Sequence, residues 1–363
     1  MTTPLIRGIF GAILAPGFIR LYAQDAEKRS AADDLAFLQQ AFTARTQPDA
    51  EQWRQRVEAR LSDLSADLDQ LIAGDQGERA LQFAVPFAYF LAHANQQKRA
   101  LEVLTRALQS PSAQAATSAR TNALYDAGLL AFRQRDQGRS RALNEESLRI
   151  AREIGDDAAA ATALIGLSRI ALREHDYKTV KKYAQEAADI RHKLGNEAGS
   201  TSAMHIVAAA LRMEGNDGQA EKFYESTLAT YRAAGDKSRV AGEQYNLGCV
   251  YIHQNRLAKA LKMFTTAMHE YRAENDEAGI AYCLNGFAAV AAVEKEPVRA
   301  AKLYGAAAAI LERLGITLDP DDQLDWDRYT DMARRQTKRV RFDREFELGR
   351  ALTIEQAVAI AMR

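Results

Sequence analysis

Cys249 and His253 stand one helical turn apart, which is the nearest approach in this sequence to a catalytic pair. A nucleophilic thiol also needs a group that orients the imidazole, and no such group accompanies them. The six histidines form no HExxH motif and no pair at ligand spacing, and neither a GxSxG elbow nor a dinucleotide fingerprint occurs. We therefore predict a protein that is not an enzyme and that uses no metal and no cofactor.

An acidic cluster near the C-terminus suggests calcium at first: Asp319, Asp321, Asp322, Asp325 and Asp327. The calcium-loop pattern is not met, because Leu324 stands where glycine is needed and Thr330 where the bidentate acid belongs. Bases follow the acids, from Arg334 to Arg344. A helix dipole favours acids at its start and bases at its end, so we interpret the charges as structural. Contact of the basic end with nucleic acid or an acidic partner is the minor alternative.

A set of polar and aromatic residues could bind a ligand: Tyr125, Arg169, His205, Arg212, Tyr245, Asn246 and Asn285. Tyrosine and arginine are common interface anchors. The columns read at i, i+4 and i+7 through this set contain no acid, so we expect both guanidinium groups to lack an internal partner. Each is then free to hold a carboxylate or phosphate in two-pronged fashion. The larger apolar members of these columns, Leu129, Phe132, Ile165 and Ile252, are expected to pack between helices instead.

A forty-residue period determines the elements that position these side chains. Gly155, Gly195, Gly235 and Gly315 follow helical stretches at multiples of forty, and Asn275 stands at the missing place. Glycine in the left-handed conformation commonly ends a helix, and asparagine is its usual substitute. Six windows align without a gap: 81–120, 121–160, 161–200, 201–240, 241–280 and 281–320. A period of this size is typical of a helical solenoid.

Within each window, small residues recur where helices must approach one another closely. In the fifth window Ala260, Phe264, Ala267 and Tyr271 are spaced four, three and four, so they share one helix face. The small residues let helix axes come together and the aromatic residues fill the gap to the next hairpin. One hairpin cannot bury both of its faces, so each needs its neighbours.

The windows resemble tetratricopeptide repeats of the longer, forty-residue form. Leu247-Gly248 with Tyr251, followed by Ala260, Phe264 and Ala267, carry the resemblance in a single window. The resemblance implies an all-α fold, a right-handed solenoid of six hairpins between helical caps, in which the first helix of each hairpin lines a concave groove. It covers roughly two-thirds of the chain.

A second resemblance concerns the two ends of the array. The segments 299–316 and 346–361, and the lead-in 53–74, look like the helical-repeat region of LuxR-type and related ATP-binding bacterial transcriptional regulators. No GxxxxGK[ST] motif of their ATPase module occurs, so we expect the repeat arm without the ATPase or DNA-binding modules.

The flanks are interpreted as an apolar N-terminal segment (1–27), a helical N-terminal cap (28–80) and a helical C-terminal cap (321–363). Asp49 is expected to cap a helix that runs to about Ile72, and Asp319-Pro320 to start another. Thr353 and Gln356 form a capping box for the last helix. Residues 8–19 are apolar but too short to span a bilayer, so export or anchoring through them is a minor alternative.

Composition limits the partner. Lysine plus arginine and aspartate plus glutamate balance at 48 each, so no net field attracts nucleic acid or anionic lipid. Two cysteines without CxxC spacing favour a reducing cytoplasm. We predict a cytoplasmic protein- or peptide-binding adaptor or regulatory scaffold whose partner is a neutral-to-acidic extended segment, with self-association left open. The alternative is a signalling-peptide or small-ligand sensor arm that acts on a separate transcriptional regulator.

Overall fold

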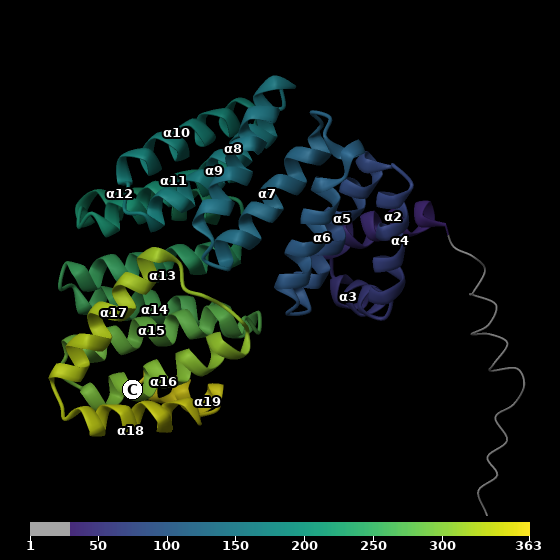
Figure 1. Cartoon of the computed structure of the whole chain (residues 1–363). Coiled ribbons are helices and arrows are strands. Elements are labelled where there is room, and N and C mark those ends of the chain that lie inside the picture. The colour runs from purple at the N-terminus through teal and green to yellow at the C-terminus, as the bar shows by residue number, and fades with distance from the viewer. Residues whose placement is uncertain (1–29) are drawn as a thin grey trace, which may run out of the picture.

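The computed structural model describes residues 30–363, which form helices and no strand. Predictions for residues 1–27, including the apolar stretch 8–19, lie outside this range. The six hairpins follow the forty-residue period: α5 (Gly77–His93) with α6 (Gln97–Gln109), α7 (Ser118–Arg133) with α8 (Gln137–Glu153), α9 (Asp157–Arg173) with α10 (Tyr177–Lys193), α11 (Glu197–Met213) with α12 (Asp217–Ala233), α13 (Lys237–His253) with α14 (Leu257–Ala273), and α15 (Glu277–Val293) with α16 (Pro297–Arg313). We number them hairpins 1 to 6. The predicted all-α solenoid is confirmed (Figure 1).

The connections between hairpins adopt the left-handed geometry that the sequence predicts. Gly155, Gly195 and Gly235 have φ of 70°, 70° and 69°, and Asn275 takes the same place with φ of 53°. After each of these residues the chain restarts at once. Asp156, for example, accepts a hydrogen bond from the backbone amide of Ala159 and so caps α9. The same left-handed turn also occurs inside the hairpins, for example at Gly215 and Asn255, so each forty-residue period contains two helix stops and two helix starts.

Small residues allow the aromatic packing between hairpins. The ring of Phe264 fills the space between Gly248 on α13 and Gly286 on α15. A Cβ atom at either glycine would lie 2.4 or 2.5 Å from that ring. Asn144, the residue of hairpin 2 equivalent to Phe264, is polar and equally buried. The apolar core divides within hairpin 2 into one part that begins at Leu38 and one that extends to the C-terminal end.

The N-terminal cap differs from its prediction in one helix. We expected one helix from Asp49 to about Ile72, but the chain forms α3 (Ala50–Glu58) and α4 (Leu61–Ala73) after α2 (Ala31–Thr43). The break at Ala59 and Arg60 lets Arg60 reach the buried carboxylate of Asp34 on α2 at 2.5 Å. Asp49 accepts a hydrogen bond from the Trp53 indole and makes no side-chain cap. A tertiary ion pair thus outweighs helix continuity.

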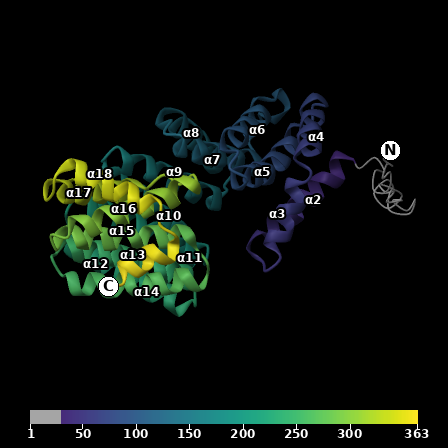
Figure 2. The same cartoon turned by 90° about the horizontal axis from the view of Figure 1, so that it is seen from below.

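Three helices close the C-terminal end: α17 (Pro320–Arg335), α18 (Arg339–Arg350) and α19 (Ile354–Ala361). The capping box of Thr353 and Gln356 at the start of α19 is confirmed. Helix α18 packs closely along α16, where a Cβ at Gly305 would lie 2.0 Å from the Phe346 carbonyl oxygen. Helix α17 instead lies across the inner side of the last hairpins (Figures 1 and 2).

The array is curved, so that distant parts of the chain approach one another. A Cβ at Gly315, in the segment 314–319 that joins α16 to α17, would lie 3.7 Å from the Asn95 side chain at the turn of hairpin 1. In Figure 1 this segment runs along the side of hairpins 5 and 6 that faces α7. None of the helices between residues 30 and 363 is long and apolar enough to cross a bilayer.

Candidate functional site: an inner polar cluster and an open groove

The residues predicted to bind a ligand divide into two groups along the inner side of the array. Arg212, Tyr245, Asn246 and Asn285 are buried together beneath α17. Tyr125 and Arg169 are only partly buried, on α7 and α9 of the earlier hairpins. His205 lies between the groups and pairs with Glu243. The predicted stripe is therefore not one continuous surface.

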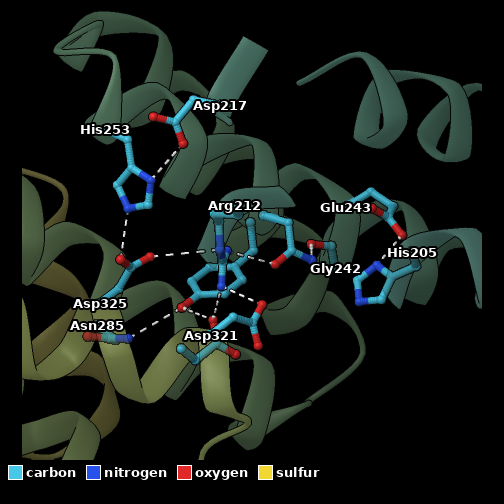
Figure 3. Close-up of polar contacts among 12 residues, drawn as sticks. His205, Arg212, Asp217, Gly242, Glu243, His253, Asn285, Asp321 and Asp325 are labelled. Atoms are coloured by element: carbon cyan, nitrogen blue, oxygen red, sulfur yellow. Dashed lines mark hydrogen bonds and ion pairs between the residues drawn. The ribbon is translucent and has the colours of Figure 1, made fainter. Parts of the chain in front are cut away.

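Arg212 is the centre of the first group (Figure 3). Its guanidinium donates to Asp321 at 2.6 Å and to Asp322 at 3.0 Å, both on the first turn of α17. It also donates to the Asn246 side chain at 3.2 Å, and the Tyr245 hydroxyl donates to Asp322 at 3.2 Å. Only 1% of the Arg212 side chain is exposed. We call Arg212, Tyr245, Asn246, His253 and Asn285 the inner polar cluster.

The prediction that Arg212 lacks an internal partner is wrong. The acids were absent from its own helix column, but α17 folds back and supplies them from more than a hundred residues further along the chain. Tyr245, predicted to offer a flat surface to a ligand, is buried by the same helix, and Asn285 donates to its hydroxyl at 3.3 Å. The sequence-based interpretation of the acids from Asp319 to Asp327 as charges that favour the helix dipole did not include their contacts with Arg212 and Tyr245.

His253 belongs to the same cluster, although sequence reasoning considered it only beside Cys249. Its Nε2 lies 2.7 Å from Asp325 on α17 and its Nδ1 lies 3.0 Å from Asp217 on α12. Burial works to raise the pKa of Asp325, but the hydrogen bond with His253 and the charge of Arg212 outweigh it and lower that pKa. Burial raises the pKa of the Cys249 thiol far above its usual value. Both nitrogens of the His253 imidazole thus lie within hydrogen-bond distance of carboxylates. Burial favours the uncharged thiol of Cys249.

His205 and Glu243 join α11 to α13, with Nδ1 2.9 Å from the carboxylate. Burial lowers the pKa of His205. The charge and hydrogen bond of Glu243 outweigh that effect and raise the pKa to about 8. His205 therefore favours its protonated form at neutral pH, where it pairs with Glu243 next to the start of α17.

An open groove of about 830 Å³ lies between the early hairpins and the segment 314–319. One wall is formed by the first helices of hairpins 1 to 3 and carries Arg133, Arg169 and Arg173. The opposite wall is formed by the start of α15 and by Asp319. We call this space the arginine groove. First helices line it, as the tetratricopeptide resemblance implies.

The arginines of this groove differ in how they are held. Arg173 stacks over the Phe132 ring at 3.5 Å and donates to the Phe132 carbonyl oxygen at 2.7 Å. Among residues 30–363, Arg133 and Arg169 have no hydrogen bond or ion pair to a side chain. Phe132 is buried, as predicted for a packing residue. Arg169 therefore has no ion pair within residues 30–363, and its role in binding a ligand stays a prediction.

Desolvation affects the acids near these arginines. It raises the pKa of half-buried Asp126 to about 7, against the opposing charges of Arg133 and Arg45. Desolvation also raises the pKa of Asp319. The negative charge of neighbouring Asp321 raises that pKa further, and the positive charge of Arg169 lowers it. Charge in this region is therefore only partly compensated within the chain, and the cations lie on one wall.

Sequence reasoning missed His253, the two groove residues Arg133 and Arg173, and the place of the acids of α17. One signal was available: the buried acids stand at i, i+1 and i+4, which is one face of a helix, whereas a dipole effect has no preference for a face. No comparable signal indicates that the last hairpins are covered while the first are open.

Comparison with known proteins supports this description of the fold. Residues 173–313 match the model of the soluble NSF attachment protein family, SNAP. No curated protein matches the chain in sequence at a significant level. Aspartyl phosphate phosphatase F from Bacillus subtilis is similar in structure, with a TM-score of 0.59 and 11% identity over 90% of this chain and 95% of that one.

Two further structures that are similar to this chain contain a bound factor or peptide. One is a Rap protein complexed with competence and sporulation factor, with a TM-score of 0.55 and 17% identity over 91% of this chain and 89% of that one. The other is the Rap conjugation gene regulator of the plasmid pLS20 in complex with the Phr* peptide, with a TM-score of 0.52 and 12% identity over 87% and 97%. At these identities the likeness establishes the fold, a tetratricopeptide-like helical array, and nothing finer.

Proposed function

We propose that this chain is a non-catalytic peptide- or protein-binding adaptor whose ligand lies in the arginine groove. The observation that carries the proposal is the contrast between the two inner surfaces. The inner polar cluster is filled by α17, whereas the arginine groove is open and presents Arg133 and Arg169, which form no ion pair with any residue between 30 and 363. A concave, pre-formed space with a few charged groups is the usual form of a ligand site.

The charges of the two walls suggest how an extended peptide would lie. A C-terminal or side-chain carboxylate would pair with Arg169 and Arg133 on the α7 and α9 wall. Asp319 on the opposite wall would accept hydrogen bonds from backbone amides of the peptide. The sequence predicted that Arg169 and Arg212 hold the carboxylate. Because Arg212 is buried by α17, the pair proposed for this role is Arg169 and Arg133. Tyr125, half-buried on α7, is retained as a flanking contact.

A regulatory role is the second candidate, because two similar structures are described as complexes with a factor or a peptide. In this version the chain is a signalling-peptide or small-ligand sensor arm that acts on a separate transcriptional regulator. A cytoplasmic location fits both candidates, since Cys249 and Cys283 are free and buried. A ligand that changes the affinity of the chain for a second protein would favour the sensor over the simple adaptor.

Selection from a library of random peptides with free C-termini tests the groove directly. We expect neutral-to-acidic binders whose Kd rises about tenfold or more in Arg169→Ala/Arg133→Ala. Arg149→Ala is the matched control, because Arg149 is exposed on α8 away from the groove. Binders that tolerate the double change as well as they tolerate the control would show that the ligand lies elsewhere.

A further inference from the structure

Helix α17 is placed differently from every other helix that follows a hairpin. Regular hairpins pack against the helix that comes next in the chain, yet the extended packing against α16 is made by α18. Helix α17 leaves the array through the segment 314–319 and contacts α11, α15 and α16 from the inner side. It therefore occupies the part of the groove where hairpins 4 to 6 would otherwise present their first helices.

The contact is built from charge on an amphipathic helix. Asp321, Asp322 and Asp325 are buried at positions i, i+1 and i+4 and face Arg212 and His253 (Figure 3). Apolar contacts add to the charged ones. The Tyr329 ring stacks on His253 with centroids 6.3 Å apart, Ala333 is buried, and the Trp326 ring packs edge-on against Tyr304 of α16 with centroids 4.8 Å apart. The carboxylates thus connect α17 to Arg212 and His253, while its aromatic residues pack beside them.

Buried ion pairs position a helix more than they stabilise it. The cost of removing both charges from water offsets most of their attraction, so such a pair adds specificity and little net free energy. A helix held mainly by apolar area would gain free energy in proportion to that area. The carboxylates of α17 therefore supply specificity for the inner polar cluster and little of the free energy that holds the helix.

Two buried atoms in this contact are left unsatisfied. Arg212 Nε and Asp325 Oδ2 have no hydrogen-bond partner, and they face each other at 3.9 Å, which is too long for a hydrogen bond. Unpaired buried polar atoms cost free energy that a better-placed partner would recover. The inner polar cluster thus retains a hydrogen-bond donor, Arg212 Nε, that α17 does not satisfy.

We propose that the inner polar cluster is a second binding surface, specific for a helix with carboxylates at i, i+1 and i+4, which α17 occupies from within the chain. A partner helix with this pattern replaces α17 by closing the gap between Arg212 Nε and the third carboxylate. The six-residue segment 314–319 is held by Leu318 in the core and exposes Gly315 and Thr317, and movement of this segment alone would let α17 move aside while α16 and α18 stay packed. This surface is separate from the arginine groove, and the proposal does not rest on the function assigned to that groove.

The test uses the full chain and a labelled synthetic peptide of residues 317–338. Asp321→Asn/Asp322→Asn weakens the internal helix but leaves the inner polar cluster intact. The matched control is Asp327→Asn/Asp331→Asn, which makes the same charge change on the exposed face of α17. Hydrogen exchange of residues 320–335 reports release of α17, and fluorescence anisotropy reports binding of the peptide.

We expect the first variant to lose amide protection in α17 and to bind the peptide about tenfold or more tightly than either wild type or the control. Adding Arg212→Gln to that variant should abolish the gain, as should Asn at all three carboxylate positions of the peptide. A concentration-dependent dimer of the first variant, in which α17 of one copy fills the cluster of the other, also supports the surface.

Two results would overturn the proposal. In the first, α17 of the folded variant keeps its protection, which would mean that apolar contacts hold it. In the second, α17 is released but the peptide does not bind at concentrations up to about 100 µM. If the double variant fails to fold, Asp321→Asn alone is used with the same readouts.

Discussion

Arg212 and Asp321 form a buried ion pair with Nη2 and Oδ2 2.6 Å apart, although 109 residues separate them in the chain. Through this pair the middle of the array determines where its C-terminal cap lies. The inner side of the molecule is consequently closed over hairpins 4 to 6 and open over hairpins 1 to 3.

Removing Arg212 should release α17. Arg212→Ala leaves buried carboxylates without a cation, which typically costs about 3–5 kcal/mol, and the chain avoids that cost by detaching the helix. Hydrogen exchange should show lost protection in 320–335 with α13 to α16 still protected. Arg169→Ala, on the open wall, should change stability by less than about 0.5 kcal/mol. Unchanged protection of α17 in Arg212→Ala would contradict this account.

The hairpin turns should penalise a side chain. Gly155→Val places a β-branched residue at φ of 70° and should lower the free energy of unfolding by about 1–2 kcal/mol in urea. Asn275→Val should cost less, because that turn already holds a side chain at φ of 53°. Equal losses at the two turns would show that left-handed strain is not the cause.

The contact between α16 and α18 should tolerate no additional atom. A Cβ at Gly305 would lie 2.0 Å from the Phe346 carbonyl oxygen, so Gly305→Ala must push the helices apart and should cost about 1–3 kcal/mol. Gly138→Ala is the control, since Gly138 has no heavy atom near its Cβ position. That change should leave the melting temperature unchanged or slightly higher. A stable Gly305→Ala protein would mean that α18 is packed more loosely than described.

The His205–Glu243 pair should make stability depend on pH. Because Glu243, with weaker help from Asp321, outweighs burial and Arg212, the folded pKa of His205 is about 8 against 6.5 for the ordinary side chain. Its stabilising contribution is therefore complete below pH 6.5 and lost as the pH rises through 8. Urea unfolding should separate wild type from Glu243→Gln more clearly at pH 6 than at pH 9. A difference that grows towards pH 9 would have the wrong sign.

The repeat architecture could be predicted from sequence because its determinants are local. Gly155 and Asn275 end helices through their own backbone torsions, and Asp156 starts the next helix three residues before the amide that it caps. The fit of Phe264 between Gly248 and Gly286 has a counterpart at the same spacing in hairpin 2, where Asn144 lies between Gly128 and Gly166. Such signals act within one hairpin or between neighbours, so each window displays them independently.

The division of the inner surface depended on the tertiary structure. Arg169 and Arg212 lie on neighbouring first helices, at repeat positions three residues apart on one helix face, and neither column contains an acid that would indicate which cation is buried. The difference comes from the path of 314–319 and from the curvature that accumulates over six hairpins, which together bring Asp321 to Arg212 and leave Arg169 facing the groove. The sequence by itself determined the helices and their period. Which of the two arginines would be buried was decided only in space, because contacts across 109 residues depend on the summed geometry of all the hairpins between them.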